Sequence, residues 1–408
     1  MRCVCCKGTH APVPAASGKV SAVLLAAPLS VCLLAGTAIL LRSSGPDLPP
    51  GVTAQAWSDA AAASRRNRGV PAEDCDVLIT LARQASRAGR TKQALDCYSR
   101  IPPDHARLGL QAVFEDAVLR LECDLAAPAE YGFQYLLKQH QTGTVLSTRQ
   151  LNVARRSLSL LYGLQMRTEE RGEILRRLMQ DRYADLHDAR YYYFPSLMIW
   201  QNAWGAEKVE SFLKLDPENR DLQNAAARYL TGFGKLSESR RTLLDLVQTD
   251  GSDLRTCAWL LECCYELDDW DTFQSVVRTL PPVTDTEPVV LTLMRGEWEM
   301  HQRRWTAAEF FFEALLKRDA ANSQAVMGLA KAMENLGRIQ ERDQFLKRSL
   351  IIADLRVGLT AAVPGRIDAI QKVAAWCREL QMQEAAMTFD FFASVESVPN
   401  EVPNLNFP

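Results

Sequence analysis

Residues 289–350 read VVLTLMRGEWEMHQRRWTAAEFFFEALLKRDAANSQAVMGLAKAMENLGRIQERDQFLKRSL, and this stretch decides the fold. One pattern of small and apolar residues occurs in it twice, with a constant offset of 34 residues between the two copies. Each copy has a helix-like segment on either side of a polar turn, so the stretch predicts two consecutive helix pairs. The matching positions are Gly296 and Ala330, Ala308 and Arg342, Phe312 and Leu346, and Leu315 and Ser349.

The same spacing continues towards the N-terminus. The small or apolar pairs that begin at Ala226, Leu260, Arg295 and Leu329 follow one another at steps of 34, 35 and 34 residues. Several nearly equal steps in succession are hard to produce by chance. Residues 219–350 are therefore the most regular part of the chain.

A repeat of this length, with small residues on its first helix and bulky apolar residues on its second, resembles the tetratricopeptide repeat. The resemblance covers residues 75–394 and is weakest over 105–215, where the spacing is irregular. It implies helix pairs that stack into a right-handed superhelix with a concave surface. We therefore expect an all-α, tetratricopeptide-like solenoid of about nine helix pairs over residues 74–396.

Individual residues have expected roles in that fold. Gly89 is expected to end the first helix of the first repeat in a left-handed conformation. Residues 351–364 interrupt the period as an insertion, and an atypical last pair follows because its outer face meets water. Small side chains are expected to let the helices of a repeat approach closely, and larger ones to fill the gap to the next repeat. The small residues are Ala82, Ala227, Gly296 and Ala330, and the larger ones are Tyr98, Leu243, Phe312 and Leu346.

The segment from Tyr191 to Trp204 departs most from the repeat pattern. It contains four consecutive aromatic residues, Tyr191 to Phe194, and two tryptophans, Trp200 and Trp204. Such a cluster is either an exposed binding patch or the interior of a wide helix pair, and the interior is the favoured interpretation.

The N-terminal part carries a membrane signal. Residues 20–41 contain no charged residue and lie between Lys19 and Arg42. As a helix that rises about 1.5 Å per residue, they would span roughly 33 Å, which is enough to cross a hydrocarbon core. They are expected to form a single, uncleaved transmembrane helix.

Three further segments complete the domain organisation. Residues 1–19 are expected to be a short tail, residues 42–73 a tether that contains Pro, Ser and Gly, and residues 397–408 a loose C-terminal tail. More basic residues precede the expected span than follow it closely. The positive-inside rule therefore places the N-terminus in the cytoplasm and the repeat domain on the extracytoplasmic side.

The eleven cysteines form no recognisable disulfide framework. Four lie at the N-terminus or in the apolar span, and the others fall inside helical patterns at irregular spacings. We expect these seven to be small buried residues of the core. They are Cys75, Cys97, Cys123, Cys257, Cys263, Cys264 and Cys377.

Composition and motifs argue against several classes of function. A net charge of −2 provides no general basic surface for nucleic acid, and the five histidines are far apart. No nucleophile elbow, phosphate-binding glycine loop, zinc protease or kinase motif occurs. Glu297 and Glu299 lie near His301, but residues two apart on a helix point in different directions. We expect no enzyme activity, no cofactor and no metal.

The resemblance also implies where a ligand would bind. Ligands of this family usually lie against the first helix of each repeat. The set of inward-facing residues is mixed in charge and does not reproduce the carboxylate-gripping arrangement of chaperone-binding members. The candidates are Asn224, Arg228, Glu262, Tyr265, Glu297 and Lys331.

These observations favour a membrane-anchored, non-catalytic scaffold that binds a protein or peptide through its helical repeats. Two other interpretations remain open. The chain could be an oligomeric structural component of an envelope biogenesis or secretion machinery, or an enzyme built on an α-solenoid. The sequence does not name the partner.

Overall fold

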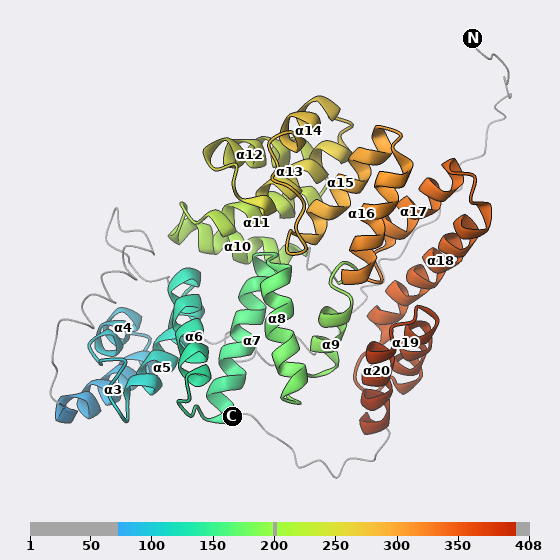
Figure 1. The fold of residues 1–408 in the computed structure, drawn as a ribbon. Coiled ribbons are helices and arrows are strands. Elements are labelled where there is room, and N and C mark those ends of the chain that lie inside the picture. Colours follow the sequence, from blue (N-terminus) through green and yellow to red (C-terminus); the bar gives the residue numbers. More distant parts are fainter. Residues whose placement is uncertain (1–71, 199–201, 397–408) are drawn as a thin grey trace, which may run out of the picture. The chain divides into compact units, whose positions relative to one another are not determined.

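A computed structural model describes residues 72–198 and 202–396 of the 408-residue chain. Every regular element in these ranges is an α-helix, and the elements are shown in Figure 1. The all-α prediction is therefore confirmed for the described residues. The helices are α3 (Ala72–Arg87), α4 (Thr91–Ser99), α5 (Gly109–Glu122), α6 (Ala126–Gln141), α7 (Thr148–Leu164), α8 (Thr168–Gln180), α9 (Leu186–Tyr193), α10 (Ala203–Leu215), α11 (Arg220–Gly232), α12 (Leu236–Thr249), α13 (Leu254–Glu266), α14 (Trp270–Val277), α15 (Val289–His301), α16 (Trp305–Arg318), α17 (Ser323–Asn335), α18 (Ile339–Ala361), α19 (Ile367–Glu379) and α20 (Gln383–Glu396).

Most of these helices pack as hairpins that share one turn. In eight hairpins three residues connect the helices, and the middle one has a φ between +53° and +75°. In the α17–α18 turn the amide of Gly337 donates to the carbonyl of Glu334, and the amide of Arg338 donates to that of Met333. These two bonds close the first helix and reverse the chain. The middle residues are Gly89, Asp124, Met166, Gly234, Asp268, Arg303, Gly337 and Gln381, so the expectation for Gly89 is confirmed.

Close packing between hairpins depends on small residues. The ring of Phe312 on α16 is fully buried between Gly296 on α15 and Gly328 on α17. A Cβ atom at either glycine would lie 2.5 Å from a ring carbon. Leu243 and Tyr98 are buried as predicted, and so are Ala82, Ala227 and Ala330.

The prediction for Leu346 is wrong, because 38% of its surface is exposed. Leu346 is exposed because of the segment after Leu350, where an insertion of residues 351–364 was expected to interrupt the period. The period is interrupted as expected, and the extra residues extend a helix: α18 continues without a break to Ala361, and α19 begins 44 residues after the start of α17 rather than 34. α19 therefore packs beside the second half of α18, where Ile352 and Leu355 are buried, and leaves Leu346 uncovered.

Helices α9 and α10 do not follow the hairpin pattern. α9 packs against α8 and α20, and α10 packs against α7 and α11. Phe194 is fully buried, with its ring centroid 5.9 Å from that of Phe389 on α20. The Tyr193 hydroxyl lies 3.0 Å from the Thr388 hydroxyl. The aromatic segment is thus interior at Phe194, whereas Trp204 is exposed.

The seven cysteines of the repeat region are free, and all but the half-buried Cys123 are buried, as expected. Burial raises the pKa of Cys263, and the neighbouring Ser239 and Thr231 hydroxyls oppose the shift. Both the expected transmembrane segment, residues 20–41, and Trp200 lie outside the described residues. None of the described helices is long and apolar enough to cross a membrane.

The packing of Phe312 makes a stability prediction. We expect Gly328→Ala to lower the free energy of unfolding by about 1–3 kcal/mol, because its Cβ cannot fit beside the ring. Gly172→Ala is the matched control: no atom lies within 4 Å of a Cβ there, and alanine should stabilise α8 by up to about 1 kcal/mol. Urea unfolding measures both, and equal stability of Gly328→Ala and wild type would contradict the packing.

A second prediction concerns Asp188 on α9. Burial, helped by Asp185 and opposed by Arg156, raises the pKa of this carboxyl to about 6. Between pH 4 and 6 the folded chain therefore binds more protons than the unfolded chain, so Asp188 makes the folded state less stable as pH rises. The free energy of unfolding of Asp188→Asn, relative to that of wild type, should therefore increase by about 2–3 kcal/mol between pH 4 and 7. Urea unfolding of both proteins at several pH values checks this. A difference in unfolding free energy between variant and wild type that stays constant with pH would refute it.

Candidate functional site

The six candidate residues lie on the first helices of four consecutive hairpins. Two are on α11, two on α13, one on α15 and one on α17. In order, they are Asn224 and Arg228, Glu262 and Tyr265, Glu297, and Lys331. The structure brings Arg228 to Glu262 and Glu297 near Tyr265 and Lys331, whereas Asn224 bonds to residues outside the set.

Arg228 and Glu262 form a buried ion pair between α11 and α13. The Nη2 group of Arg228 donates to Oε1 of Glu262 at 2.8 Å, and Nη1 lies 2.6 Å from Oε2. Only 8% of the Arg228 side chain and 13% of the Glu262 side chain are exposed. Burial raises the pKa of Glu262, and Arg228 opposes that shift. The arginine therefore serves first to neutralise a buried carboxylate.

The side-chain amide of Asn224 also makes its contacts inside the protein. It is buried, its Nδ2 group donates to Oδ2 of Asp253 at 3.1 Å, and its Oδ1 accepts from the Thr256 hydroxyl at 2.9 Å. Both functions of its amide are thus used between α11 and the start of α13.

Tyr265, Glu297 and Lys331 remain partly or fully accessible. Burial and then the nearby Glu297 raise the pKa of Tyr265 to about 12. Burial raises the pKa of Glu297, while Lys331 opposes the shift. A phenol, a carboxylate and an ammonium group from three consecutive helices therefore lie next to one another on this face.

An aromatic cluster adjoins them. The Trp270 ring meets that of Tyr265 edge-on, with centroids 5.9 Å apart, and stacks on His301 at 3.8 Å. The Trp298 ring stacks on the buried Phe273 at 5.6 Å. The cluster fills the space between the α13–α14 and α15–α16 hairpins, and its edge reaches the surface at His301.

The three titratable residues near the end of α15 do not converge. Glu297 contacts Tyr265, Glu299 pairs with Arg304, and His301 stacks on Trp270. Helical spacing separates Glu299 from the other two, which lie two residues away on either side, and His301 is held apart from Glu297 by its stack on Trp270. The part of the chain that the structure describes contains no group of three or more His, Cys, Asp or Glu side chains that could hold a metal ion.

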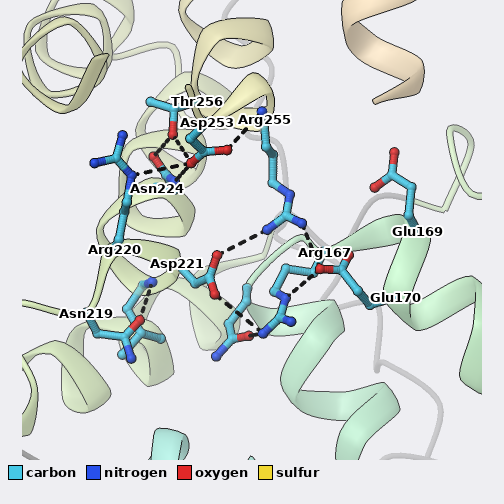
Figure 2. A network of polar contacts seen from close by, with 12 residues as sticks. Arg167, Glu169, Glu170, Asn219, Arg220, Asp221, Asn224, Asp253, Arg255 and Thr256 are labelled. Atoms are coloured by element: carbon cyan, nitrogen blue, oxygen red, sulfur yellow. Dashed lines mark hydrogen bonds and ion pairs between the residues drawn. The ribbon is translucent and has the colours of Figure 1, made fainter. Parts of the chain in front are cut away.

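Sequence reasoning missed a polar network at the N-terminal ends of these helices, shown in Figure 2. Arg167, just before α8, donates to Glu170 at 3.0 Å and lies 3.4 Å from Asp221 at the start of α11. Arg255 on α13 donates to Glu170 at 2.7 Å and to Asp221 at 3.1 Å. Burial acts to raise the pKa of Glu170, but Arg255 and Arg167 outweigh it and hold the pKa low. The network joins α8 to α11 and α13.

A second part of the network centres on Asp253, which caps α13 (Figure 2). Its carboxylate accepts hydrogen bonds from the Arg255 amide, Arg220, Asn224 and Thr256. Burial acts to raise the pKa of Asp253, and these donors outweigh it. All its strong acceptor capacity is used inside the protein, so the network acts as a structural junction.

The 34-residue repeat spacing could have predicted some of these ion pairs. Asp221 and Arg255 are 34 residues apart, as are Arg228 and Glu262. Residues one period apart lie side by side on neighbouring first helices, so opposite charges at that spacing predict pairs. No such signal exists for Glu170, which lies 85 residues from Arg255.

The outer face of the last helix carries an exposed apolar stripe. Met387, Phe391 and Val395 on α20 are 65%, 61% and 47% exposed, and they follow one another at four-residue spacing. The outer face of α20 is exposed, as expected of the last pair, but these three side chains on it are apolar. We call these three residues the α20 stripe.

No protein-family model and no curated protein matches this sequence. Among solved structures, the chain is similar to a tetratricopeptide repeat protein from Parabacteroides merdae ATCC 43184, with 12% identity and a TM-score of 0.31 over 64% of this chain and 99% of that one. The tetratricopeptide domain of P58(IPK) gives 13% identity and a TM-score of 0.27, covering 80% and 94%. The human IFIT1 dimer with PPP-AAAA gives 10% identity and a TM-score of 0.33, covering 88% of this chain and 96% of that one. Scores this low decide neither family nor function.

The Arg228–Glu262 pair can be tested by a double-mutant cycle. Glu262→Gln should lower the free energy of unfolding by about 3 kcal/mol, because it leaves a buried guanidinium without its counter-charge. Replacing both residues by Met should recover most of this loss. The control is Glu210→Gln, whose partner Lys214 is equally exposed; it should change stability by less than about 0.5 kcal/mol. Equal losses in the single and double variants would rule out the coupling.

Proposed function

We propose that this chain is a membrane-anchored, non-catalytic scaffold that binds another protein through its helical repeats. The observation that carries the proposal is the α20 stripe. A helical-repeat domain normally closes its stack with a polar outer face, because that face has no neighbouring repeat to cover it. Apolar side chains at this position favour a protein partner.

The spacing of the α20 stripe indicates the kind of partner. Residues at i, i+4 and i+8 lie on one side of a helix, which is how helices present anchors to one another. Phe391 contributes the largest apolar surface, and its ring meets that of Phe392 edge-on, with centroids 5.7 Å apart. An amphipathic helix of the partner, with its own apolar side against Met387 and Phe391, fits this surface.

The face of α11, α13, α15 and α17 offers a second contact area for a peptide. Asn224 and Arg228 are buried and paired, which leaves Tyr265, Glu297 and Lys331 for contact. These three form a small set of mixed charge, whereas the α20 stripe is a continuous apolar row. We therefore assign the main partner contact to α20.

Anchoring is proposed from the sequence of residues 20–41, which is long and apolar enough to span a bilayer. Their flanking charges favour a cytoplasmic N-terminus and an extracytoplasmic repeat domain. The non-catalytic assignment is supported by the separate partners of Glu297, Glu299 and His301. An oligomeric structural component is the alternative, which a self-association surface would favour.

Proximity labelling tests partner binding and membrane side together. A labelling enzyme is fused after Pro408 of the full chain, and Met387→Glu/Phe391→Glu is compared with wild type. The variant should lose a defined set of extracytoplasmic proteins, because charge on the stripe opposes burial. Val145→Glu, an exposed apolar residue in a loop, is the control and should keep the set.

Three outcomes would count against the proposal. If wild type and both variants label the same proteins, the stripe does not bind the partner. If the labelled proteins are cytoplasmic, the orientation is wrong. If the chain leaves the membrane fraction in alkaline carbonate, residues 20–41 do not anchor it.

A further inference from the structure

The longest described helix is apolar on two opposite sides. α18 has 23 residues, while the neighbouring helices have 13 or 14. One side is buried: Ile352, Leu355 and Leu359 pack within the core, and the Trp376 ring covers Gly358 so closely that a Cβ would lie 2.2 Å from its Cζ3 atom. This side accounts for the attachment of α18 to α19.

The opposite side is exposed and has coiled-coil spacing. Leu350 and Val357 are 67% and 70% exposed, and Leu346 and Ala353 lie on the same side, also exposed. The four residues, which we call the α18 seam, follow one another at steps of four, three and four. The same alternation of three- and four-residue steps extends to Asp343 before the seam and to Thr360 after it. Two helices that pack along their length use this spacing.

A surface helix normally has a single apolar side that faces the core, so a second apolar side indicates a further contact. Among the described residues, nothing covers the α18 seam, because its large side chains remain exposed. The seam lies on a different helix from the α20 stripe, so it is a separate surface. It therefore needs an occupant of its own.

We propose that the α18 seam binds the same seam of a second copy of this chain, with the two helices antiparallel. In this register Leu346 faces Val357 of the partner subunit, and Leu350 faces Ala353 of the partner subunit. Large residues meet smaller ones in each layer, and the two-fold axis repeats each layer once. The interface is self-complementary in shape.

The charges beside the seam favour this arrangement. Lys347 and Asp354 are exposed and have no ion pair among the described residues. They are seven residues apart, about 10 Å along the helix, so they cannot pair within one copy. Antiparallel packing places Lys347 beside Asp354 of the partner subunit, and the symmetry forms this pair twice.

A parallel arrangement would place like charges together. Asp343, which continues the seam, would face Asp343 of the partner subunit across the core of the interface. Arg342 would lie beside Lys347 of the partner subunit on both sides. Buried like charges and repelling flanks are unfavourable, so the sequence of α18 selects the antiparallel dimer.

A charge swap in the full-length chain tests the proposal. Sedimentation velocity in detergent, over about 1 to 100 µM, measures the dimer dissociation constant. Lys347→Glu and Asp354→Lys should each weaken the dimer about 5- to 10-fold, since each places like charges together. The double swap restores opposite charges across the interface and should return the constant to within about twofold of wild type. Leu350→Glu should weaken the dimer by at least about 30-fold.

The controls separate this surface from the rest of the molecule. All the substituted residues are exposed, so helicity should match wild type, and so should unfolding midpoints at concentrations where every chain is monomeric. Phe391→Glu on α20 should leave the dimer unchanged. A wild-type chain that stays monomeric over the whole range overturns the proposal. So does a dimer that resists Leu350→Glu, that dissociates with Phe391→Glu, or that the double swap does not restore.

Discussion

The burial of Phe312 between the backbones of α15 and α17 shows the constraint on which the rest of the structure depends. A helix hairpin has apolar side chains on both its outward surfaces and cannot bury them by itself, so it must stack on another hairpin. Gly296 and Gly328 permit that stacking because any larger side chain would occupy the space of the ring. The common three-residue turn keeps each hairpin geometrically alike, so the same solution can be used repeatedly. The fold therefore repeats one hairpin geometry along the chain.

Repetition also brings charges together. Side chains one period apart lie on neighbouring first helices, and Asp221 with Arg255 and Arg228 with Glu262 form ion pairs in this way. Because these groups are mostly buried, each is held by its counterpart rather than left free for a ligand. The face on which the resemblance to tetratricopeptide repeats places ligands is therefore largely occupied by its own contacts. Surfaces open to partners arise where the repetition fails.

It fails at two places near the C-terminus. α18 is longer than one period allows and so exposes a second apolar side, and α20, the last described helix, leaves its stripe exposed. One surface is self-complementary in charge and shape, whereas the other has a single apolar row. We therefore assign self-association to α18 and partner binding to α20. A dimer would carry two α20 stripes, which joins the scaffold and oligomeric interpretations.

The sequence by itself determined the helical class, the 34-residue hairpin and the residues that allow close packing, because these depend on contacts within one period. It also placed Gly89 in its left-handed turn and the cysteines in the core. It placed the interruption of the period after Leu350, but it was wrong about Leu346 and did not show that the extra residues extend α18, because the length of α18 depends on how α19 packs against its second half. It could not place Phe194 beside Phe389 or Glu170 beside Arg255, since those residues lie far apart in the chain and no local pattern encodes their contact. Only the tertiary structure decided which candidate residues are buried, because exposure depends on what every other helix covers.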